Sequence, residues 1–583
     1  MRCGPGRAHE TRPAVTASGF DRLGGSLRAA LRAGPRRMAH RVWRLVQSRM
    51  VDAILGRWLY RPSPTVGYWD AADGDAAAAL HAMAQLRQQG AISRGWNRGA
   101  SELSLVRQHA ISMVPPVDWT HRHAEEALVA TRLHEWDWAW GALAESRYGL
   151  MRDLALDWIS TCTIGRGTAW QPYPLSRRLV VWSTLVALGW RDEALIESIE
   201  QQAGFLRAHL ERDLENNHLI ANLKALAWVA LLSADRGEAD GRVDAALDSF
   251  WRAFIRQVRA DGGHFENTSS YHAAVLLDGL EVARLCDALG IAVSESARET
   301  LGSMVTYMTH LTHNDGAAPL LGDSIVDEPV PMTLLAASCD GQALPAAQGS
   351  QLFPKSGLAS LRAGQTHLVF DCGDLGPRHC PGHGHADALS IVLWSQGRER
   401  IVDPGTYQYA SGEWRDWFRG TAAHATAMVD GEDQSQFVGP FRVGRMSRTR
   451  IICDEVSGKR RVVAEHDGYR RLRDGVIHRR EVTLPDEHRV HLVDRFVGQG
   501  EHDVAVRFPL APGAVSVGDK NASVRYDDGV SMTVRWDGSG WQAALEEGWL
   551  SREWYTKQPI PVLCIRWRGA VPCCLETCLE IKS

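Results

Sequence analysis

The sequence predicts a chain of two parts, an array or toroid of α-helices followed by a β-sandwich or barrel. Apolar residues recur at helical spacing from about residue 43 to about residue 337. After about residue 351 the pattern changes to short β-branched runs that Gly and Asp interrupt. This change of period near residue 350 indicates that the chain contains two differently built domains.

The first part contains helices that are apolar on most faces and helices with a single apolar face. Residues 221–232 are almost all apolar, so we expect this helix to be buried on several sides. Residues 177–188 and 273–289 are amphipathic, and breakers such as Pro172 and Gly290 separate the helices. Many helices with short polar loops favour an array or toroid. The sequence contains no repeat of fixed period, so a solenoid is the weaker interpretation.

The second part contains short runs that are typical of β-strands. Examples are residues 389–394 and 562–567, and residues 395–398 have the composition of a hairpin turn. A linker rich in small residues, 341–349, separates the two parts. The predicted division is a poorly structured basic extension of residues 1–42, a helical domain of residues 43–341 and a β domain of residues 350–583.

Composition and charge exclude several classes of protein. The formal net charge is −4 over 583 residues, which gives no support for nucleic acid as a partner, so an acidic ligand must meet a local basic site. No apolar run of about 18 residues predicts a membrane span. The N-terminus shows no secretion signal, so we expect a cytoplasmic protein, or a periplasmic one if the start site is misassigned. The oligomeric state stays open.

The 11 cysteines have no regular spacing, which argues against a disulfide framework. Cys573, Cys574 and Cys578 form a cluster that would suit a soft metal. Adjacent side chains on a strand alternate between faces, however, so we interpret the cluster as plain buried thiols.

Asn216, Asn217 and His218 open the apolar helix and form the first polar motif. An Asn at a helix start is commonly an N-cap, and for Asn216 this interpretation is as good as a functional one. His218 and Asn222 stand four residues apart and so share one face, which is polar where the rest of the helix is apolar. A buried polar face needs partners, and a substrate is one candidate.

The second motif, residues 263–272, lies between two predicted helices and contains Glu266, Tyr271 and His272. Its Ser and Thr residues are also those of a simple helix cap, and a tyrosine beside a histidine is commonly structural. Between two helices of a toroid, however, these side chains are well placed to line a cleft.

The third motif is His383-Gly384-His385, which Asp403 and His424 follow further along the chain. In an extended segment both imidazoles point the same way, so they can share a metal or divide between a metal and a substrate. His385, Asp403 and His424 form a set of imidazole and carboxylate groups that suits Zn²⁺. Alone, a His-x-His pattern is weak, because core and exposed histidines are commoner than ligands.

The order of these motifs resembles that of the heparinase II/III-like polysaccharide lyases. The resemblance covers roughly residues 136–438, and the segments that carry it are residues 170–178, 217–218, 266–272, 383–387 and 403–405. It implies an N-terminal α/α toroid, which is an incomplete barrel, and a C-terminal antiparallel β-sandwich, with the active site where they meet. It also implies β-elimination next to a uronic acid in an acidic polysaccharide.

The resemblance implies a role for each motif residue. Asn217 and His218 would lie against the uronate carboxylate, while Tyr271 would exchange protons with the sugar ring carbon or the leaving oxygen. His383 would be the opposite acid or base. A structural zinc ion would fix this loop through His385, Asp403 and His424. The expected substrate-binding residues are Arg178, Trp170, Tyr173, Glu266 and His272.

Two other interpretations stay open. A glycoside hydrolase on the same toroid would need two carboxylates across the cleft, and Glu266 has no obvious partner. A non-catalytic glycan-binding or assembly protein of this fold has no need of the complete set of Asn, His and Tyr residues. Because no secretion signal is visible, a lyase could serve bacterial envelope or capsular polysaccharide metabolism.

Overall fold

The computed structural model describes residues 28–29, 32, 34–47, 60, 69–90, 102–106, 109–120, 127–234, 241–326, 328, 330–331, 335 and 347–582. Within these residues no helix is both long and apolar enough to cross a membrane. Most of the predicted N-terminal extension and of the predicted linker lies outside the described residues. The end of that extension is helical, because α2 (Pro35–Val46) covers it.

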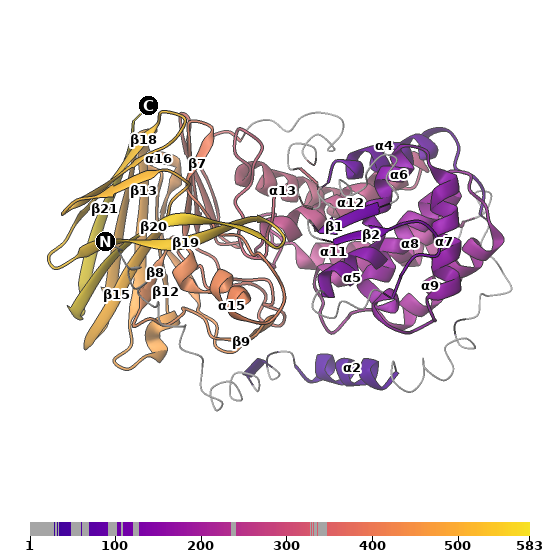
Figure 1. Cartoon of the computed structure of the whole chain (residues 1–583), viewed down its shortest axis with the longest axis horizontal. Helices are drawn as coiled ribbons and strands as arrows, with labels where there is room; N and C mark the ends of the chain where they lie inside the picture. Colours follow the sequence, from indigo (N-terminus) through magenta and orange to yellow (C-terminus); the bar gives the residue numbers. More distant parts are fainter. Residues whose placement is uncertain are drawn as a thin grey trace, which may run out of the picture.

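The first half of the chain is an array of helices around one large apolar core (Figure 1). Helix α10 packs against α8, α11 and α12 and so occupies a central place in the array. A small sheet of β1 (Glu102–Val106) and β2 (His109–Ser112) lies in the same half. The helices after α2 are α4 (Gly74–Gln88), α5 (Ala127–Glu135), α6 (Trp140–Ala144), α7 (Tyr148–Thr161), α8 (Pro172–Ala187), α9 (Glu193–Ala208), α10 (Asn217–Leu232), α11 (Gly241–Gln257), α12 (Ser269–Ala288) and α13 (Glu295–Leu311).

Side-chain caps fix where the two helices that carry the polar motifs begin. The side chain of Asn216 accepts a hydrogen bond of 3.1 Å from the backbone N–H of His218, so Asn216 is the N-cap of α10. Thr268 caps α12 in the same way, because its hydroxyl accepts from the N–H of Tyr271 at 3.1 Å. Asn217, His218 and Tyr271 therefore all lie in the first turn of a helix.

The second half consists of antiparallel sheets, which confirms the predicted change from helices to strands (Figure 1). The five-stranded sheet contains, in order, β3 (Gln351–Phe353), β4 (Leu358–Ala363), β5 (Thr366–Asp371), β6 (Ile391–Ser395) and β7 (Arg398–Ile401). The four-stranded sheet contains β19 (Gln542–Glu553), β20 (Thr556–Ala570), β15 (Glu501–Pro509) and β8 (Ala427–Val429).

The largest sheet has eight strands, and a second apolar core lies between it and the other sheets. Buried and less buried residues alternate along β13, as expected of a strand with one face on that core. In order, the sheet contains β11 (Thr449–Glu455), β12 (Arg461–His466), β13 (Ile477–Asp486), β14 (Arg489–Val497), β21 (Cys573–Lys582), β18 (Ser531–Asp537), β17 (Asn521–Arg525) and β16 (Ala514–Val517).

Short elements lie in both halves. Those of the helical half are η3 (Asp137–Ala139) and η4 (Thr168–Trp170). Those of the β half are α15 (Glu413–Arg419), η5 (Thr421–Ala423), β9 (Phe437–Gly439), β10 (Arg442–Val443), α16 (Val456–Lys459) and η6 (Gly468–Arg471).

The cysteine cluster lies on a long strand. Cys573, Cys574 and Cys578 all lie on β21 and form no disulfide. Cys574 is exposed, so the prediction of buried thiols is wrong for this residue.

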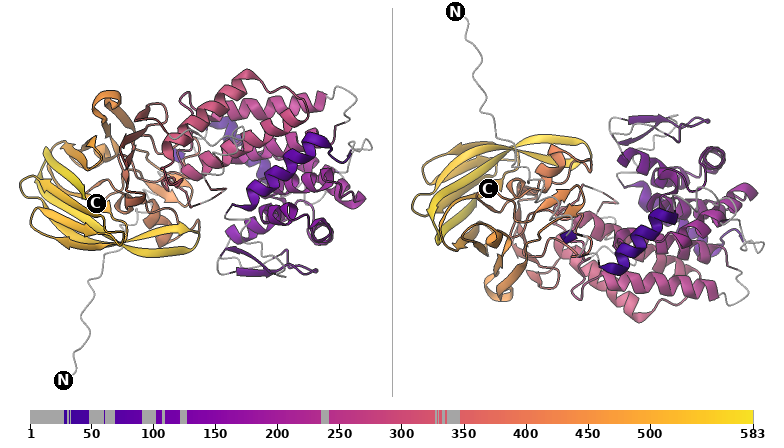
Figure 2. Two further views of the ribbon diagram at one scale, coloured as in Figure 1. Left: turned by 90° about the horizontal axis from the view of Figure 1, so that it is seen from above. Right: turned by 90° about the horizontal axis from the view of Figure 1, so that it is seen from below.

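The two halves contact each other along one side, where hydrogen bonds and a hairpin cross between them (Figure 2). The Asp261 carboxylate, in the loop after α11, accepts hydrogen bonds from Lys355 N at 2.7 Å and Ser356 N at 2.9 Å. The Ser356 hydroxyl donates to the same carboxylate at 2.6 Å. The turn between β19 and β20 carries Trp554, and in Figure 1 this hairpin points toward the helical half.

Candidate active site and metal site

Tyr271 and His383 come from different halves of the chain and face each other. Tyr271 lies in the first turn of α12, whereas His383 lies in the loop between β5 and β6. Their ring centroids are 4.1 Å apart. The Tyr271 hydroxyl is also 2.6 Å from that of Tyr409. Burial, and then the neighbouring Tyr409, raise the pKa of Tyr271 well above its usual value, so the hydroxyl is protonated.

Asn217 and His218 present polar groups from the start of α10. The Nδ1 atom of His218 is 3.2 Å from a Glu211 carboxylate oxygen. Burial, the largest single influence, lowers the pKa of His218, but the charge and hydrogen bond of Glu211, together with the charges of nearby Glu266 and Glu135, outweigh burial and raise it. The Asn217 side-chain oxygen is buried and has no hydrogen-bond partner among the described residues. Burying an acceptor without a hydrogen bond costs about 1–3 kcal/mol of folding stability. A ligand that donated a hydrogen bond to this oxygen would recover that cost.

The Asp323 carboxylate connects the motif histidines. It bonds to Nδ1 of His383 at 2.9 Å and to Nε2 of His385 at 3.0 Å. Thr406 and Arg415 also donate to it. Burial would raise the pKa of Asp323, but Arg415 and the histidines outweigh burial and hold it well below its usual range. The charged carboxylate therefore orients both imidazole rings.

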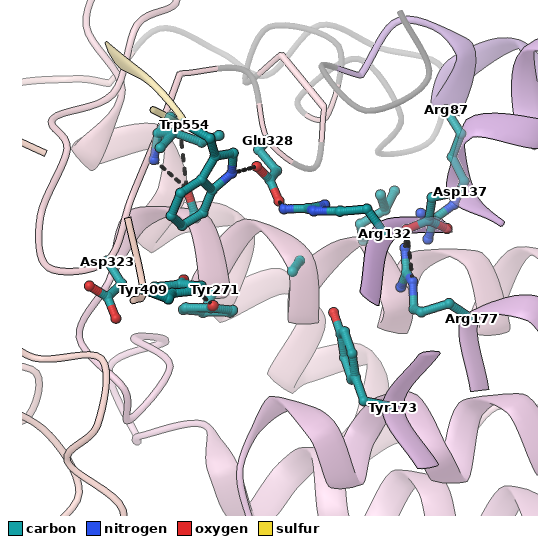
Figure 3. Close-up of a pocket in the computed structure, with 14 residues that line it drawn as sticks. Arg87, Arg132, Asp137, Tyr173, Arg177, Tyr271, Asp323, Glu328, Tyr409 and Trp554 are labelled. Carbon is teal, nitrogen blue, oxygen red and sulfur yellow. Dashed lines mark hydrogen bonds and ion pairs between the residues drawn. The ribbon is translucent and has the colours of Figure 1, made fainter. Parts of the chain in front are cut away.

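A small pocket of about 50 Å³ opens beside Tyr271 (Figure 3). Tyr271, Tyr409 and Asp323 lie at one end of it, and arginines lie at the other. Each arginine is paired with a carboxylate: Arg177 with Asp137, Arg132 with Glu328, and Arg87 with Glu281. Trp554 donates to Glu328 at 2.8 Å, so the β19–β20 turn forms part of the wall.

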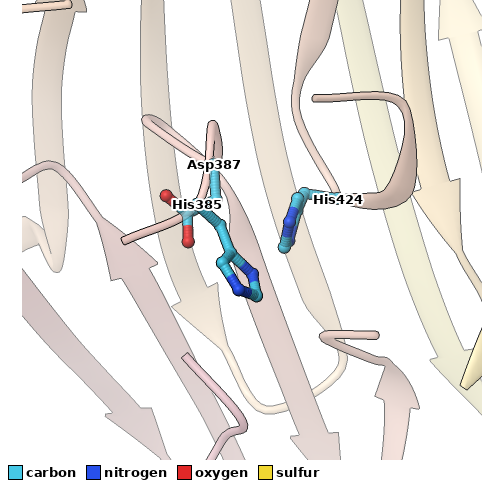
Figure 4. Close-up of side chains that lie close together, drawn as sticks. All are labelled: His385, Asp387 and His424. Carbon is cyan, nitrogen blue, oxygen red and sulfur yellow. The ribbon is translucent and has the colours of Figure 1, made fainter. Parts of the chain in front are cut away.

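His385, Asp387 and His424 form a buried group that could hold a metal ion (Figure 4). One potential ligand atom from each residue lies within 4.8 Å of the others. Nδ1 of His385 and Nε2 of His424 are buried and have no partner among the described residues, so both are available to a metal. Burial lowers the pKa of His385 to about 4, which keeps the imidazole in the neutral form that binds metals.

The second nitrogen of each metal-site histidine bonds to a carboxylate. Nε2 of His385 bonds to Asp323, and Nδ1 of His424 is 3.1 Å from Asp403. A carboxylate behind a histidine is the usual support of a metal ligand. Two of the predicted ligands, His385 and His424, therefore belong to the group, while Asp403 lies behind His424 and Asp387 stands in its place.

Arg178, predicted to bind substrate, lies in the helical core and does not line the pocket. Its side chain is fully buried and donates to Gln202, to the His134 carbonyl and to the Ala169 carbonyl, each at 2.9 Å. The adjacent Arg177 lines the pocket instead. Successive residues of a helix point about 100° apart, so of these two adjacent arginines one faces the pocket and the other the core.

Trp170 and His272, also predicted to bind substrate, do not line the pocket either. Trp170 is buried in the helical core, where its ring packs edge-on against Phe205 at 5.1 Å. His272 bonds to the Met304 carbonyl at 3.1 Å, and burial lowers its pKa to about 4. Both residues are conventional parts of the core.

Tyr173 and Glu266, also predicted to bind substrate, lie close to the residues of the polar motifs. Tyr173 lines the pocket, and its ring stacks on His218 with centroids 4.3 Å apart. Glu266 accepts from the Asn217 backbone N–H at 2.9 Å, and its other oxygen is 3.7 Å from Nε2 of His383. Glu266 thus lies between the two halves of the site.

Comparison with known families gives two matches. The "Heparinase II/III N-terminus" model matches residues 116–335, and the "Heparinase II/III-like, C-terminal" model matches residues 345–573. A heparin-sulfate lyase of Bacteroides stercoris is 23% identical over 368 residues, which are 58% of this chain and 52% of that protein. The heparin-sulfate lyase of Bacteroides thetaiotaomicron is also 23% identical, over 56% of this chain and 50% of its own length. The chain spans about half the length of these curated relatives.

Solved structures share the fold over almost the whole chain. The crystal structure of a heparinase III has a TM-score of 0.67 at 16% identity and covers 95% of this chain and 91% of its own. The heparan sulfate lyase HepC of Pedobacter heparinus has a TM-score of 0.57 at 16% identity and covers 98% and 92%. Because the two family models together match most of the sequence, the chain belongs to the heparinase II/III-like family.

Proposed function

We propose that the protein is a polysaccharide lyase that cleaves an acidic, uronate-containing polysaccharide by β-elimination. The observation that carries this proposal is the approach of Tyr271 and His383 across the domain boundary, with ring centroids 4.1 Å apart. Asn217 and His218 stand near them at the start of α10. The names of the curated relatives, both heparin-sulfate lyases, support the same reaction class.

The first task in such a reaction is to neutralise the substrate carboxylate. The proton to be removed lies on the carbon next to this group, and it is hard to remove while the carboxylate keeps its full negative charge. His218 meets this need, because Glu211 raises its pKa and so favours the positive imidazolium. The side-chain amide of Asn217 stands beside His218, and its N–H group donates a hydrogen bond to the same substrate carboxylate. Both interactions strengthen as negative charge builds up in the transition state.

The second task is to move two protons. Asp323 holds the Nδ1–H of His383, which leaves Nε2 as the acceptor for the proton on the carbon next to the carboxylate. As this C–H bond breaks, its electrons form the C=C bond, and the C–O bond to the neighbouring sugar breaks. Tyr271 is protonated and donates its proton to the leaving oxygen.

We also infer that the metal group holds zinc. Two imidazole nitrogens and one carboxylate are ligands that Zn²⁺ accepts, and they leave a fourth position open. Asp323 and Asp403 would orient the two histidines. When bound, the ion would supply rigidity to the loop that carries His383, since elimination requires no activated water. The chain's own residues carry both proton transfers.

Hydrolysis is the weaker alternative. It requires a carboxylic acid and a second carboxylate that activates water or attacks the sugar. Asp323 is fully occupied by His383, His385, Thr406 and Arg415, so it is not free to act on a substrate. The other pocket carboxylates, Asp137 and Glu328, are held in ion pairs by Arg177 and Arg132. Glu266 therefore has no unengaged carboxylate partner among the described pocket residues.

Incubation with a panel of uronate-containing polysaccharides tests the proposal, because elimination creates an unsaturated sugar that absorbs ultraviolet light. We expect absorbance to rise with at least one polysaccharide and the rise to be lost in Tyr271→Phe. Tyr148→Phe is the matched control, since Tyr148 lies on α7 outside the pocket. New reducing ends without absorbance would mean hydrolysis, and no product from any polysaccharide would favour a binding protein.

A further inference from the structure

A second groove, on the β domain, is lined mainly by arginines and has a volume of about 580 Å³. Seven arginines and two aspartates line it, so its charge is strongly positive although the chain as a whole is slightly negative. We call it the arginine groove. One of its arginines, Arg471, forms an ion pair with Glu432. The other six are Arg28, Arg32, Arg378, Arg445, Arg448 and Arg470.

Most of the positive charge of the arginine groove has no ion-pair partner among the described residues. Arg378, Arg445, Arg448 and Arg470 are exposed, and none of them forms an ion pair with another residue that the structure describes. The two aspartates of the groove are engaged elsewhere. Asp467 accepts from the backbone N–H of Arg448 at 2.8 Å, and Asp374 accepts from that of Thr449 at 2.9 Å.

Arg28 and Arg32 add charge to the groove from the N-terminal segment. Arg28 donates to the side chain of Gln436 at 3.2 Å, and Arg32 donates to the carbonyl of Val443. Both contacts hold the guanidinium groups in place without cancelling their charge. Burial, and then the like charges of Arg378 and Arg28, lower the pKa of Arg32. Crowded cations of this kind are stabilised by a bound anion.

One loop carries both a lining residue of the arginine groove, Arg378, and His383, which faces Tyr271 beside the pocket. Arg378 precedes His383 by five residues in the connection between β5 and β6. The same loop contacts the segment that leads to Tyr271, because Asn267 donates to the carbonyl of Asp374 at 2.7 Å. The ring of His379 also packs edge-on against Phe265, with centroids 5.5 Å apart. A linear polymer that passes His383 and follows this loop therefore reaches Arg378 at the groove.

We propose that the arginine groove binds a second anionic stretch of the same acidic polysaccharide whose reacting bond occupies the pocket. Guanidinium groups recognise carboxylate and sulfate through paired N–H donors, so both substituents of an acidic glycan suit the groove. The identity of the ligand rests on the proposed lyase function, whereas the anion binding itself does not. Free sulfate or nucleic acid shares part of this chemistry, and the experiment separates them.

The test measures affinity for a short and a long heparin oligosaccharide, a tetrasaccharide and a dodecasaccharide, in the Tyr271→Phe protein so that neither is cleaved. The groove variant adds Arg445→Glu, Arg448→Glu and Arg470→Glu. The matched control adds Arg166→Glu, Arg284→Glu and Arg525→Glu, which are exposed arginines outside the groove and without ion pairs among the described residues. Equal thermal midpoints for the two variants would establish that both are folded.

We expect the dodecasaccharide to bind more tightly than the tetrasaccharide, and the ratio of the two affinities to fall at least tenfold in the groove variant but not in the control. Loss of three cationic contacts should also reduce the slope of log affinity against log salt by about 3. An unchanged ratio would overturn the proposal. So would single-stranded DNA of equal charge, or inorganic sulfate, competing for the groove as well as the dodecasaccharide does.

These outcomes are distinct from those that test the lyase function. If no polysaccharide is cleaved but the affinity ratio falls in the groove variant, the lyase proposal fails and the groove remains a glycan site. If a polysaccharide is cleaved and the ratio does not change, the groove proposal fails and the lyase remains.

Discussion

The side-chain oxygen of Asn217 is buried and unpaired among the described residues, so at this position function and stability make opposite demands. Replacement by Ala removes an acceptor that the folded protein leaves unsatisfied. We expect Asn217→Ala to unfold at the same temperature as the natural protein or a higher one. The same change should lower kcat/KM about 10²-fold, the usual effect of losing one transition-state hydrogen bond.

Asn222, one turn further along α10, is the matched control for this prediction. Its side chain accepts from the Glu211 N–H at 2.9 Å and donates to the Ser176 hydroxyl at 3.0 Å. Asn222→Ala should therefore lower the thermal midpoint. A fall in the midpoint of Asn217→Ala as large as that of Asn222→Ala would contradict the proposed role of Asn217.

His218 and Glu211 predict a pH dependence of activity. His218 carries its positive charge below its pKa and loses it as the pH rises through that value. The Glu211 charge raises this pKa, so Glu211→Gln should lower it. We expect the alkaline limb of the kcat/KM profile to move to lower pH in Glu211→Gln. Glu200→Gln, on α9, is the control, and an alkaline limb that stays in place in Glu211→Gln would refute the role of His218.

Candidate site residues that stand together in a short motif could be recognised from the sequence. Candidate site residues that stand alone in the sequence could not. Asn217-His218 and His383-Gly384-His385 each combine two functional residues in a short motif. Asp323 and Tyr409 have no such neighbours, and only the fold brings them to His383 and Tyr271. Arg415 was missed for the same reason, since its role is to hold Asp323.

At the level of secondary-structure elements, the metal group ties two short segments together. His385 and Asp387 lie in the loop between β5 and β6, and His424 directly follows η5. We expect the purified protein to contain about one zinc ion per chain, and a chelator to lower its thermal midpoint. Mass spectrometry of the metal content and thermal unfolding with and without chelator measure both effects.

Variants of the aspartates distinguish a ligand from its support. Asp387→Asn should lose the metal, whereas Asp403→Asn should weaken binding by about 10–100-fold, as expected when a carboxylate behind a histidine is removed. Asp503→Asn, on β15, is the control. If Asp387→Asn retained the metal with full affinity while Asp403→Asn lost it, the ligand assignment would have to be reversed.

Whether a segment is a helix or a strand could be predicted from the sequence. The direction in which a single side chain of that segment points could not. The almost wholly apolar run 221–232 becomes most of α10 (Asn217–Leu232), which is buried nearly throughout, because only the array interior can cover every face. Helical spacing alone did not distinguish Arg177 from Arg178, since both lie on α8 and both are buried. Their difference depends on which neighbouring helix supplies a carboxylate, and this is a property of the tertiary structure.

For the whole molecule, the position of one half against the other decides whether the site exists, since each half supplies one of its two facing rings. Asp261 anchors this contact through three hydrogen bonds to Lys355 and Ser356. We expect Asp261→Ala to cost about 1–3 kcal/mol and so to lower the urea midpoint. It should also raise KM, because the pocket walls would no longer be held at a fixed separation.

Asp248→Ala is the control for the domain contact, since Asp248 forms only an exposed ion pair with Arg252 on α11. Such a pair contributes little to stability. If the two alanine variants had equal urea midpoints and equal KM values, Asp261 would not hold the halves together.

Trp554 forms part of the pocket wall, and its place in the sequence determines when the pocket can form during translation. The helical half emerges from the ribosome first and can begin to fold while the β strands are still being made. Trp554, which bonds to Glu328 and packs against Tyr409, belongs to a hairpin near the C-terminal end of the sheet half. A nascent chain therefore cannot close its pocket until translation has passed this hairpin, and translation products truncated before it would lack a complete pocket.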